Sequence, residues 1–209
     1  MRVRRSWRAT STYPVNYSPP RRRTSEARDR RTRAATAKQK SRSRHTELRF
    51  VTVFFAVIAA FYTLTAFAWV DRHLVFPVMA VSARGASWLL NLGGAHTVLD
   101  GICIRGPDFA VAVRRGCDPI EPIVLLGAAL CAFPSSLKRK GSGILLGGTF
   151  LFALNVVRIS TLYVAGRAHV AWFDHLHQEW WPAGFILATL GSWFGWLHCL
   201  RLRAVSSHA

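Results

Sequence analysis

The sequence predicts an all-α integral membrane protein. We expect about four transmembrane helices, an interfacial helix, a small extracytoplasmic hairpin and a disordered basic N-terminal tail. Three observations predict this fold class. Of the 209 residues, 51% are hydrophobic, although the chain carries 28 Lys and Arg against 10 Asp and Glu. Residues 1–50 hold 16 of the basic and 3 of the acidic residues, so most of the net charge of +18 lies there. The remainder contains uncharged runs of membrane-spanning length.

The first 47 residues are predicted to be a disordered basic cytoplasmic tail. They are rich in Arg, Ser, Thr and Pro and nearly free of aliphatic residues, so they cannot bury enough apolar surface to offset chain entropy. Two uses stay open: a solvated tail that orients the first helix, or a contact with anionic lipid or, less favoured, nucleic acid. The composition excludes a single soluble basic domain, and four cysteines are too few for a disulfide-rich scaffold.

Residues 48–203 are predicted to be a multi-pass membrane domain. Its four candidate spans are Phe50–Val70, Ile120–Ser136, Gly141–Gly166 and Trp181–Leu200. A helix of about 20 residues crosses a hydrocarbon core of ~30 Å. Leu74–Leu92 contains Arg84, whose charge is costly at mid-membrane. We therefore expect an interfacial amphipathic helix there, not a span.

The positions of Lys and Arg predict the topology. Basic clusters flank the spans in the tail, at Lys138–Lys140 and from Arg201, and the positive-inside rule places all three in the cytoplasm. The number of membrane crossings between these clusters agrees with this topology only if Leu74–Leu92 does not cross the membrane. Arg114–Arg115 is the exception, because it lies outside. Short β-prone runs separated by Gly and Pro-Asp between residues 93 and 116 predict the extracytoplasmic hairpin.

Three reactive side chains are expected at a similar depth. Cys117 lies 22 residues before Arg139 and Arg158 lies 19 after it, which correspond to roughly 33 and 28 Å of helix. His177 lies 24 residues before Arg201, roughly 36 Å. All three therefore reach the outer interface. A thiol, a guanidinium and an imidazole at one level are the components of a cysteine-nucleophile acyl-transfer site.

The residue types fit that chemistry. Cys117 is expected at the N-terminal end of a helix, where the dipole favours a thiolate. An imidazole such as His177 titrates near neutral pH, so it can take the thiol proton and return it to a leaving amine. A fixed guanidinium such as Arg158 can bind a developing oxyanion or a substrate carboxylate.

Four further side chains are supporting candidates. Asn155 lies one turn before Arg158 and is expected to orient it. Asp174 and His175 belong to the same loop as His177. Glu121 is a second acid or, as we favour, an ion-pair partner for Arg114 or Arg115.

Other interpretations stay open for these residues. A cysteine in an apolar region is usually a small core residue, which suits Cys131 and Cys199. Cys103 and Cys117 could form a disulfide. An arginine in an outer turn often only snorkels, and the histidines could be plain loop residues. No metal or other cofactor is expected, because Asp174, His175 and His177 do not have the spacing of a zinc site.

Three motifs together resemble the exosortase/archaeosortase family, most closely the exosortase H type. They are GCDPIEP from Gly116, a longer segment with NVVRI from Asn155, and FDHLHQEWW from Phe173. The resemblance covers about residues 113–200. The order of Cys, N-x-x-R-I and F-D-x-x-H across three spans is specific as a set, whereas each motif alone is weak.

The resemblance implies an enzyme of the bacterial or archaeal membrane, here the cell inner membrane. Family members are regarded as transpeptidase-like cysteine proteases that process the C-terminal sorting signals of exported proteins, each made of a short motif, a transmembrane helix and a basic cluster. The motifs assign Cys117 as nucleophile, Arg158 as the family arginine and His177 as the histidine. The H type implies an Ile-Pro-Thr-Leu-like signal.

Two features depart from the family pattern. Asp118-Pro119 follows the cysteine where related sequences have Asn or Ser and then Gly, and the long basic tail is additional. The alternative function is therefore a non-catalytic membrane assembly or scaffold protein whose polybasic tail binds anionic lipid or nucleic acid.

Overall fold

The structure of the protein, a computed structural model, describes residues 22–206. The chain divides into two compact units, Met1–His45 and Thr46–Ala209. In chain order the elements are α1 (Arg22–Thr65), α2 (Ala68–Val70), the π-helical turn η1 (Asp71–Val75), α3 (Phe76–Leu92), β1 (Val98–Asp100), β2 (Cys103–Arg105), β3 (Ala110–Ala112), α4 (Ile120–Ala132), α5 (Leu137–Ala168), α6 (Val170–His175), the π-helical turn η2 (Leu176–Trp180) and α7 (Trp181–Ser206). The predicted all-α membrane fold class is confirmed.

The described part of the basic tail is helical where disorder was expected. Residues 22–47 belong to α1, and residues 1–21 lie outside the described part of the chain. The physical reason is local composition, because Ala, Lys, Gln, Glu and Arg are good helix formers and dominate this segment. The division into a tail of residues 1–47 and a domain of residues 48–203 stays a prediction.

Four helices are long and apolar enough to cross a membrane. By length and composition they are Ser43–Thr65, Ala68–Leu92, Leu137–Ala168 and Ala171–Leu202. The predicted span Ile120–Ser136 is wrong in extent, because α4 has only 13 residues, about 20 Å of helix. The helix ends where Phe133 becomes extended, with φ −75° and ψ 137°, as expected for a residue that precedes proline.

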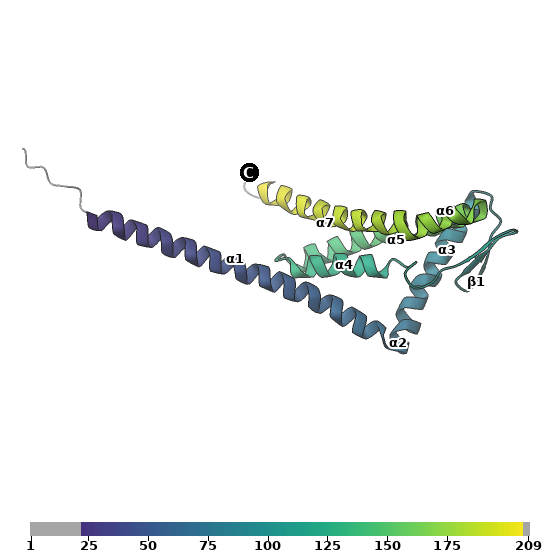
Figure 1. Cartoon of the computed structure of the whole chain (residues 1–209), viewed down its shortest axis with the longest axis horizontal. Helices are drawn as coiled ribbons and strands as arrows, with labels where there is room; N and C mark the ends of the chain where they lie inside the picture. The colour runs from purple at the N-terminus through teal and green to yellow at the C-terminus, as the bar shows by residue number, and fades with distance from the viewer. Residues whose placement is uncertain (1–21, 207–209) are drawn as a thin grey trace, which may run out of the picture. The chain divides into compact units, whose positions relative to one another are not determined.

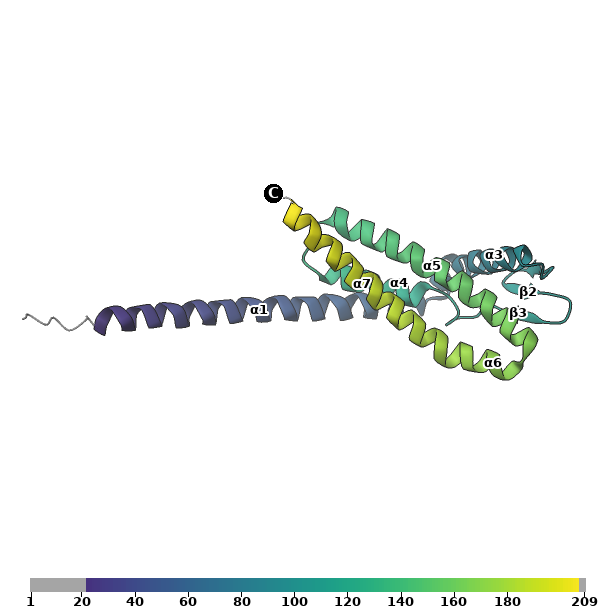
Figure 2. The ribbon, with the colours of Figure 1, turned by 90° about the horizontal axis from the view of Figure 1, so that it is seen from above.

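Helix α3 has a different direction from α5 and α7. Figures 1 and 2 show α5 and α7 running alongside each other with α4 beside them, whereas α3 crosses α5 at an angle. Arg84 of α3 is exposed. Ala68–Leu92 is long and apolar enough to be a span, contrary to the expectation that Leu74–Leu92 is too polar to cross, and its interfacial position stays a prediction.

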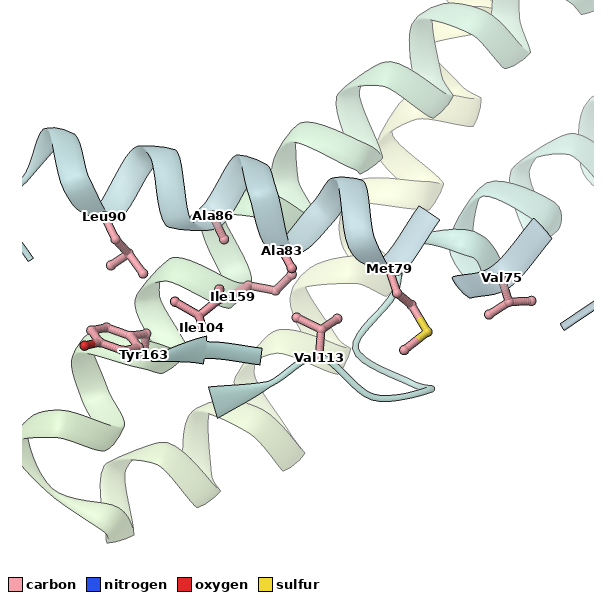
Figure 3. Close-up of a cluster of buried hydrophobic side chains, with 9 residues drawn as sticks. All are labelled: Val75, Met79, Ala83, Ala86, Leu90, Ile104, Val113, Ile159 and Tyr163. Atoms are coloured by element: carbon pink, nitrogen blue, oxygen red, sulfur yellow. The ribbon is translucent and has the colours of Figure 1, made fainter. Parts of the chain in front are cut away.

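Two apolar clusters hold this unit together. The first joins α3, the sheet and α5 through buried side chains, which Figure 3 draws: Val75, Met79, Ala83, Ala86, Leu90, Ile104, Val113, Ile159 and Tyr163. The second joins α4, α5 and α7 through Leu126, Leu130, Leu151 and Phe185. Large side chains such as Phe55, Leu145 and Phe194 are exposed, as expected for helices that face lipid.

The segment expected to be a hairpin is a three-stranded antiparallel sheet. Its order is β1-β2-β3, and Gly101, with φ +61°, provides the left-handed residue of the first turn. Thr97 joins the sheet to α3, because its N–H donates to Asn91 Oδ1 at 2.6 Å and its hydroxyl lies 2.9 Å from Ser87 Oγ. Strand β3 ends five residues before Cys117, so the sheet leads directly into the candidate site.

Candidate active site

A tight turn between β3 and α4 presents Cys117. The Cys117 N–H donates to the Arg114 carbonyl at 2.9 Å, and Gly116 has φ +85°, a conformation that favours glycine. Asp118 is buried, and its carboxylate accepts the N–H groups of Gly116 at 3.2 Å and Ile120 at 3.0 Å. Asp118 therefore fixes the turn and the start of α4, a role that the sequence analysis missed. An Asp two residues before a helix start is a recognisable signal for such a turn.

The thiol of Cys117 contacts an imidazole from a distant part of the chain. Cys117 Sγ lies 3.1 Å from His177 Nε2, and both side chains are half-buried. His177 lies in η2, and the Phe173 ring stacks on it with ring centroids 5.6 Å apart and an interplanar angle of 6°. The stacking limits rotation of the imidazole, so Nε2 stays directed at the sulfur. A thiol within hydrogen-bond reach of an oriented imidazole is the arrangement of an activated cysteine.

Arg158 lies on the other side of the cysteine turn. Its side chain is 6% exposed, and Nη1 donates to the Gly116 carbonyl at 3.1 Å. The guanidinium carbon lies 5.5 Å from the centre of the Phe185 ring, a cation–π distance. Its positive charge interacts favourably with an ionised Cys117 and with Asp118. Arg158 is therefore fixed beside the sulfur and does not reach out to a membrane surface.

The supporting candidates lie in different surroundings. Asn155 is fully buried, but its amide has no hydrogen-bond partner among the described residues, so no hydrogen bond joins it to Arg158. His175 is exposed, and its Nδ1 lies 3.5 Å from Glu179 Oε2. Asp174 is also exposed, and its charge interacts favourably with a protonated His177.

Arg115 has a different ion-pair partner from the one expected. Its guanidinium pairs with Asp71, with Nε 2.9 Å from Oδ1, and also donates to the Thr65 carbonyl at 3.2 Å. Glu121 is exposed at the start of α4, and within residues 22–206 no ion pair joins it to Arg114 or Arg115. The favoured pairing was wrong because Asp71 is remote in sequence and only the fold brings it close.

The remaining cysteines and acids form no further site. All four cysteines are free, so Cys103 and Cys117 form no disulfide. Cys131 and Cys199 are exposed and far along the helices from Cys117. Among residues 22–206, no group of three or more His, Cys, Asp and Glu side chains could hold a metal ion.

A comparison with protein families identifies the family of this chain. A family model described as transmembrane exosortase (Exosortase_EpsH) matches residues 47–192, more than half of the chain. The chain belongs to the transmembrane exosortase family. Comparison with curated proteins and comparison with solved structures gave no match. The matched range contains the Cys117 turn, Arg158 and His177, and it excludes residues 1–46. Membership of the exosortase family is consistent with a membrane transpeptidase role.

The cysteine and histidine of this exosortase line one cavity. Its volume is about 420 Å³, and its walls come from β3, the cysteine turn, α5 and the end of α6. The lining residues are Phe109, Ala110, Val111, Ala112, Val113, Arg114, Arg115, Cys117, Ile159, Leu162, Phe173 and His177. A volume in this range suits a small ligand or a short peptide segment. The side chain of Cys117 is therefore accessible from a mostly apolar cavity.

Proposed function

We propose that this chain is a membrane-embedded cysteine transpeptidase or protease that processes the C-terminal sorting signals of exported proteins. The single observation that carries this proposal is the 3.1 Å contact between Cys117 Sγ and His177 Nε2 beside the buried Arg158. That contact occurs in a chain of the transmembrane exosortase family. A thiol, a base and a fixed cation are the groups that thiol-dependent acyl transfer requires.

The first half-reaction forms a thioester. His177 Nε2 takes the Cys117 proton, and the thiolate attacks the carbonyl carbon of the scissile peptide bond. The oxygen of that carbonyl becomes an oxyanion, which the Arg158 guanidinium stabilises by charge and hydrogen bonding. The intermediate collapses as the C–N bond breaks, and His177 returns its proton to the leaving amine. The exposed carboxylate of Asp174 stabilises the protonated imidazole between these steps.

The second half-reaction releases the product. An acceptor amine or water gives a proton to His177 and attacks the thioester carbon. The C–S bond then breaks, the sulfur leaves as a thiolate, and His177 returns the proton to it to regenerate the thiol. Transfer to an amine makes the chain a transpeptidase, and transfer to water makes it a protease. No metal or cofactor takes part in this scheme. The motif resemblance of the sequence points to the exosortase H type and an Ile-Pro-Thr-Leu-like substrate signal.

The reaction is assigned to the extracytoplasmic face of the cell inner membrane. The support is the excess of Lys and Arg before the first span, at Lys138–Lys140 and after the last span, which the positive-inside rule places in the cytoplasm. We expect a membrane-impermeant maleimide added to intact spheroplasts to label Cys117. Labelling of that cysteine only after permeabilisation would place the site on the cytoplasmic side.

The function is tested with a reporter that carries tags at both ends. The reporter is an exported protein that ends in an Ile-Pro-Thr-Leu-like motif, a transmembrane helix and a basic cluster. We expect loss of its C-terminal tag only in cells that contain the chain, and equal loss with and without the chain would contradict the proposal. A variant without residues 1–45 is the control, because the scaffold alternative needs the polybasic tail whereas the catalytic proposal does not.

Arg158→Lys should reduce processing by roughly a hundred- to a thousandfold, because lysine keeps the charge but loses the planar fork. The rate of reporter cleavage by detergent-solubilised protein measures this. Arg167→Lys is the matched control, since Arg167 lies on the same helix, is exposed and pairs with Asp108 at 3.4 Å. A normal rate in the Arg158 variant would remove this side chain from the mechanism.

A further inference from the structure

Strand β3 is an edge of the sheet, and its free edge has defined hydrogen-bonding groups. The Val113 N–H donates to Ile102 O, and the Phe109 carbonyl accepts the Gly106 N–H, both at 2.9 Å. These two hydrogen bonds lie just before and just after β3, and both are on the side of β3 that faces β2. In an antiparallel ladder, hydrogen-bonded residues alternate with residues whose main-chain groups point away from the partner strand. The N–H and C=O groups of Ala110 and Ala112 therefore point toward the open edge.

That open edge is accessible and is not covered by the rest of the described chain. Ala110 and Ala112 are exposed, and within residues 22–206 no main-chain hydrogen bond joins either residue to an element outside the sheet. Their methyl side chains leave room for a second backbone to approach. An unpaired strand edge of this kind is a template for an added strand.

The same edge forms a wall of the reactive cavity. Ala110 and Ala112 line the cavity of about 420 Å³ together with Cys117 and His177. The opposite wall is apolar and includes Ile159, Leu162 and Phe173. An extended peptide in this cavity would have its main chain along β3, its alternate side chains against the apolar wall, and a carbonyl near the sulfur.

We infer that the acyl donor binds by β-augmentation: the segment around its scissile bond adds to β3 as an extended strand, with main-chain hydrogen bonds to Ala110 and Ala112. This inference rests on the proposed function, because it takes the occupant of the cavity to be the peptide that Cys117 attacks. A helical segment cannot make these bonds, since its main-chain groups are already paired. The signal must therefore be extended around the cleaved bond, even though a transmembrane helix follows it.

The test uses a tetra-alanine chloromethyl ketone and the full chain in detergent micelles. The Cys117 thiolate attacks the methylene carbon of this reagent, a C–S bond forms and chloride leaves, and mass spectrometry quantifies the Cys117 adduct over time. Four further reagents each carry one N-methyl group, at successive alanines. We expect N-methylation to slow alkylation at least about fivefold at alternate alanines only, because each such group removes one hydrogen bond to β3. Uniform slowing, or no slowing at any position, would overturn the inference.

Iodoacetamide separates the two proposals, because it alkylates the thiol without needing to dock. If neither reagent modifies Cys117 faster than the exposed Cys131 of the same protein, the proposed function fails. If iodoacetamide modifies Cys117 rapidly but the peptide body gives no advantage, the function stands and strand addition fails. That second outcome is also the one expected if a second copy of the chain covers the edge of β3.

Ala112→Pro tests the group on β3 that would form one of these hydrogen bonds with the peptide. Proline removes the outward N–H and is tolerated on strand edges. We expect the rate of Cys117 alkylation by the tetra-alanine chloromethyl ketone, divided by the rate with iodoacetamide, to fall about fivefold. An unchanged ratio would contradict the pairing, and the N-methyl series on the unmodified chain decides the question if this variant does not fold.

Discussion

Cys117→Ala is expected to abolish processing of the tagged reporter, with a fall in rate of at least about a thousandfold. The physical reason is that no other side chain near His177 can form the thioester, and loss of a nucleophile typically removes nearly the whole rate enhancement. Reporter cleavage by purified protein measures the effect. Cys117→Ser should be nearly as inactive, because a hydroxyl is a far weaker nucleophile than a thiolate.

Cys199→Ala is the matched control for that experiment. Cys199 is free and exposed on α7, so its replacement should leave the rate of cleavage unchanged. A trapped adduct gives a second readout, because the unmodified chain should form a hydroxylamine-sensitive bond to the reporter and the Cys117 variant should not. Normal cleavage by the Cys117→Ala protein would end the proposal of a thioester.

His177→Ala is expected to slow cleavage by about a hundred- to ten-thousandfold, the usual contribution of a positioned general base. His177 Nε2 is 3.1 Å from the sulfur, whereas His175 is exposed and lies beside Glu179. His175→Ala should therefore keep most of the activity. The two alanine variants can be compared directly. Both residues lie in one short helical segment, so their replacement by alanine should affect the stability of that segment similarly.

A merely structural role for His177 makes a different prediction. Phe173 stacks on the imidazole, so a side chain of similar size should restore packing without restoring proton transfer. We expect His177→Gln to give a well-folded protein by size-exclusion chromatography and still to be as slow as the alanine variant. Recovery of activity in the glutamine variant, or a larger loss from His175→Ala, would contradict the assignment of His177 as the general base.

The helices and the main site could be predicted because their signals are local in the sequence. Long apolar runs predicted α5 and α7, and the spacing of Cys117, Arg158 and His177 from basic turns predicted a common depth. In the structure Cys117 contacts His177, whereas Arg158 donates to the main chain next to Cys117 and lines a neighbouring cavity. Their roles in catalysis stay predictions, because geometry alone does not measure a rate.

The differences from the sequence predictions have both remote and local causes. The partner of Arg115 is Asp71, which is 44 residues away, and no sequence pattern links the two. Asn155 is buried and its amide has no hydrogen-bond partner among the described residues, so its expected role in orienting Arg158 stays a prediction. Helix α4 is short because Pro134 follows Phe133, a local stop signal that the hydrophobic run concealed.

The separation of Cys117 and His177 along the chain also bears on biosynthesis. His177 follows Cys117 by 60 residues, so the ribosome delivers the thiol well before the imidazole. Until η2 is synthesised and packed, the sulfur lacks the neighbour that it contacts at 3.1 Å in the folded chain. Under the proposed function, an incomplete or wrongly assembled polypeptide would therefore lack its general base, and activity would depend on completion of the fold.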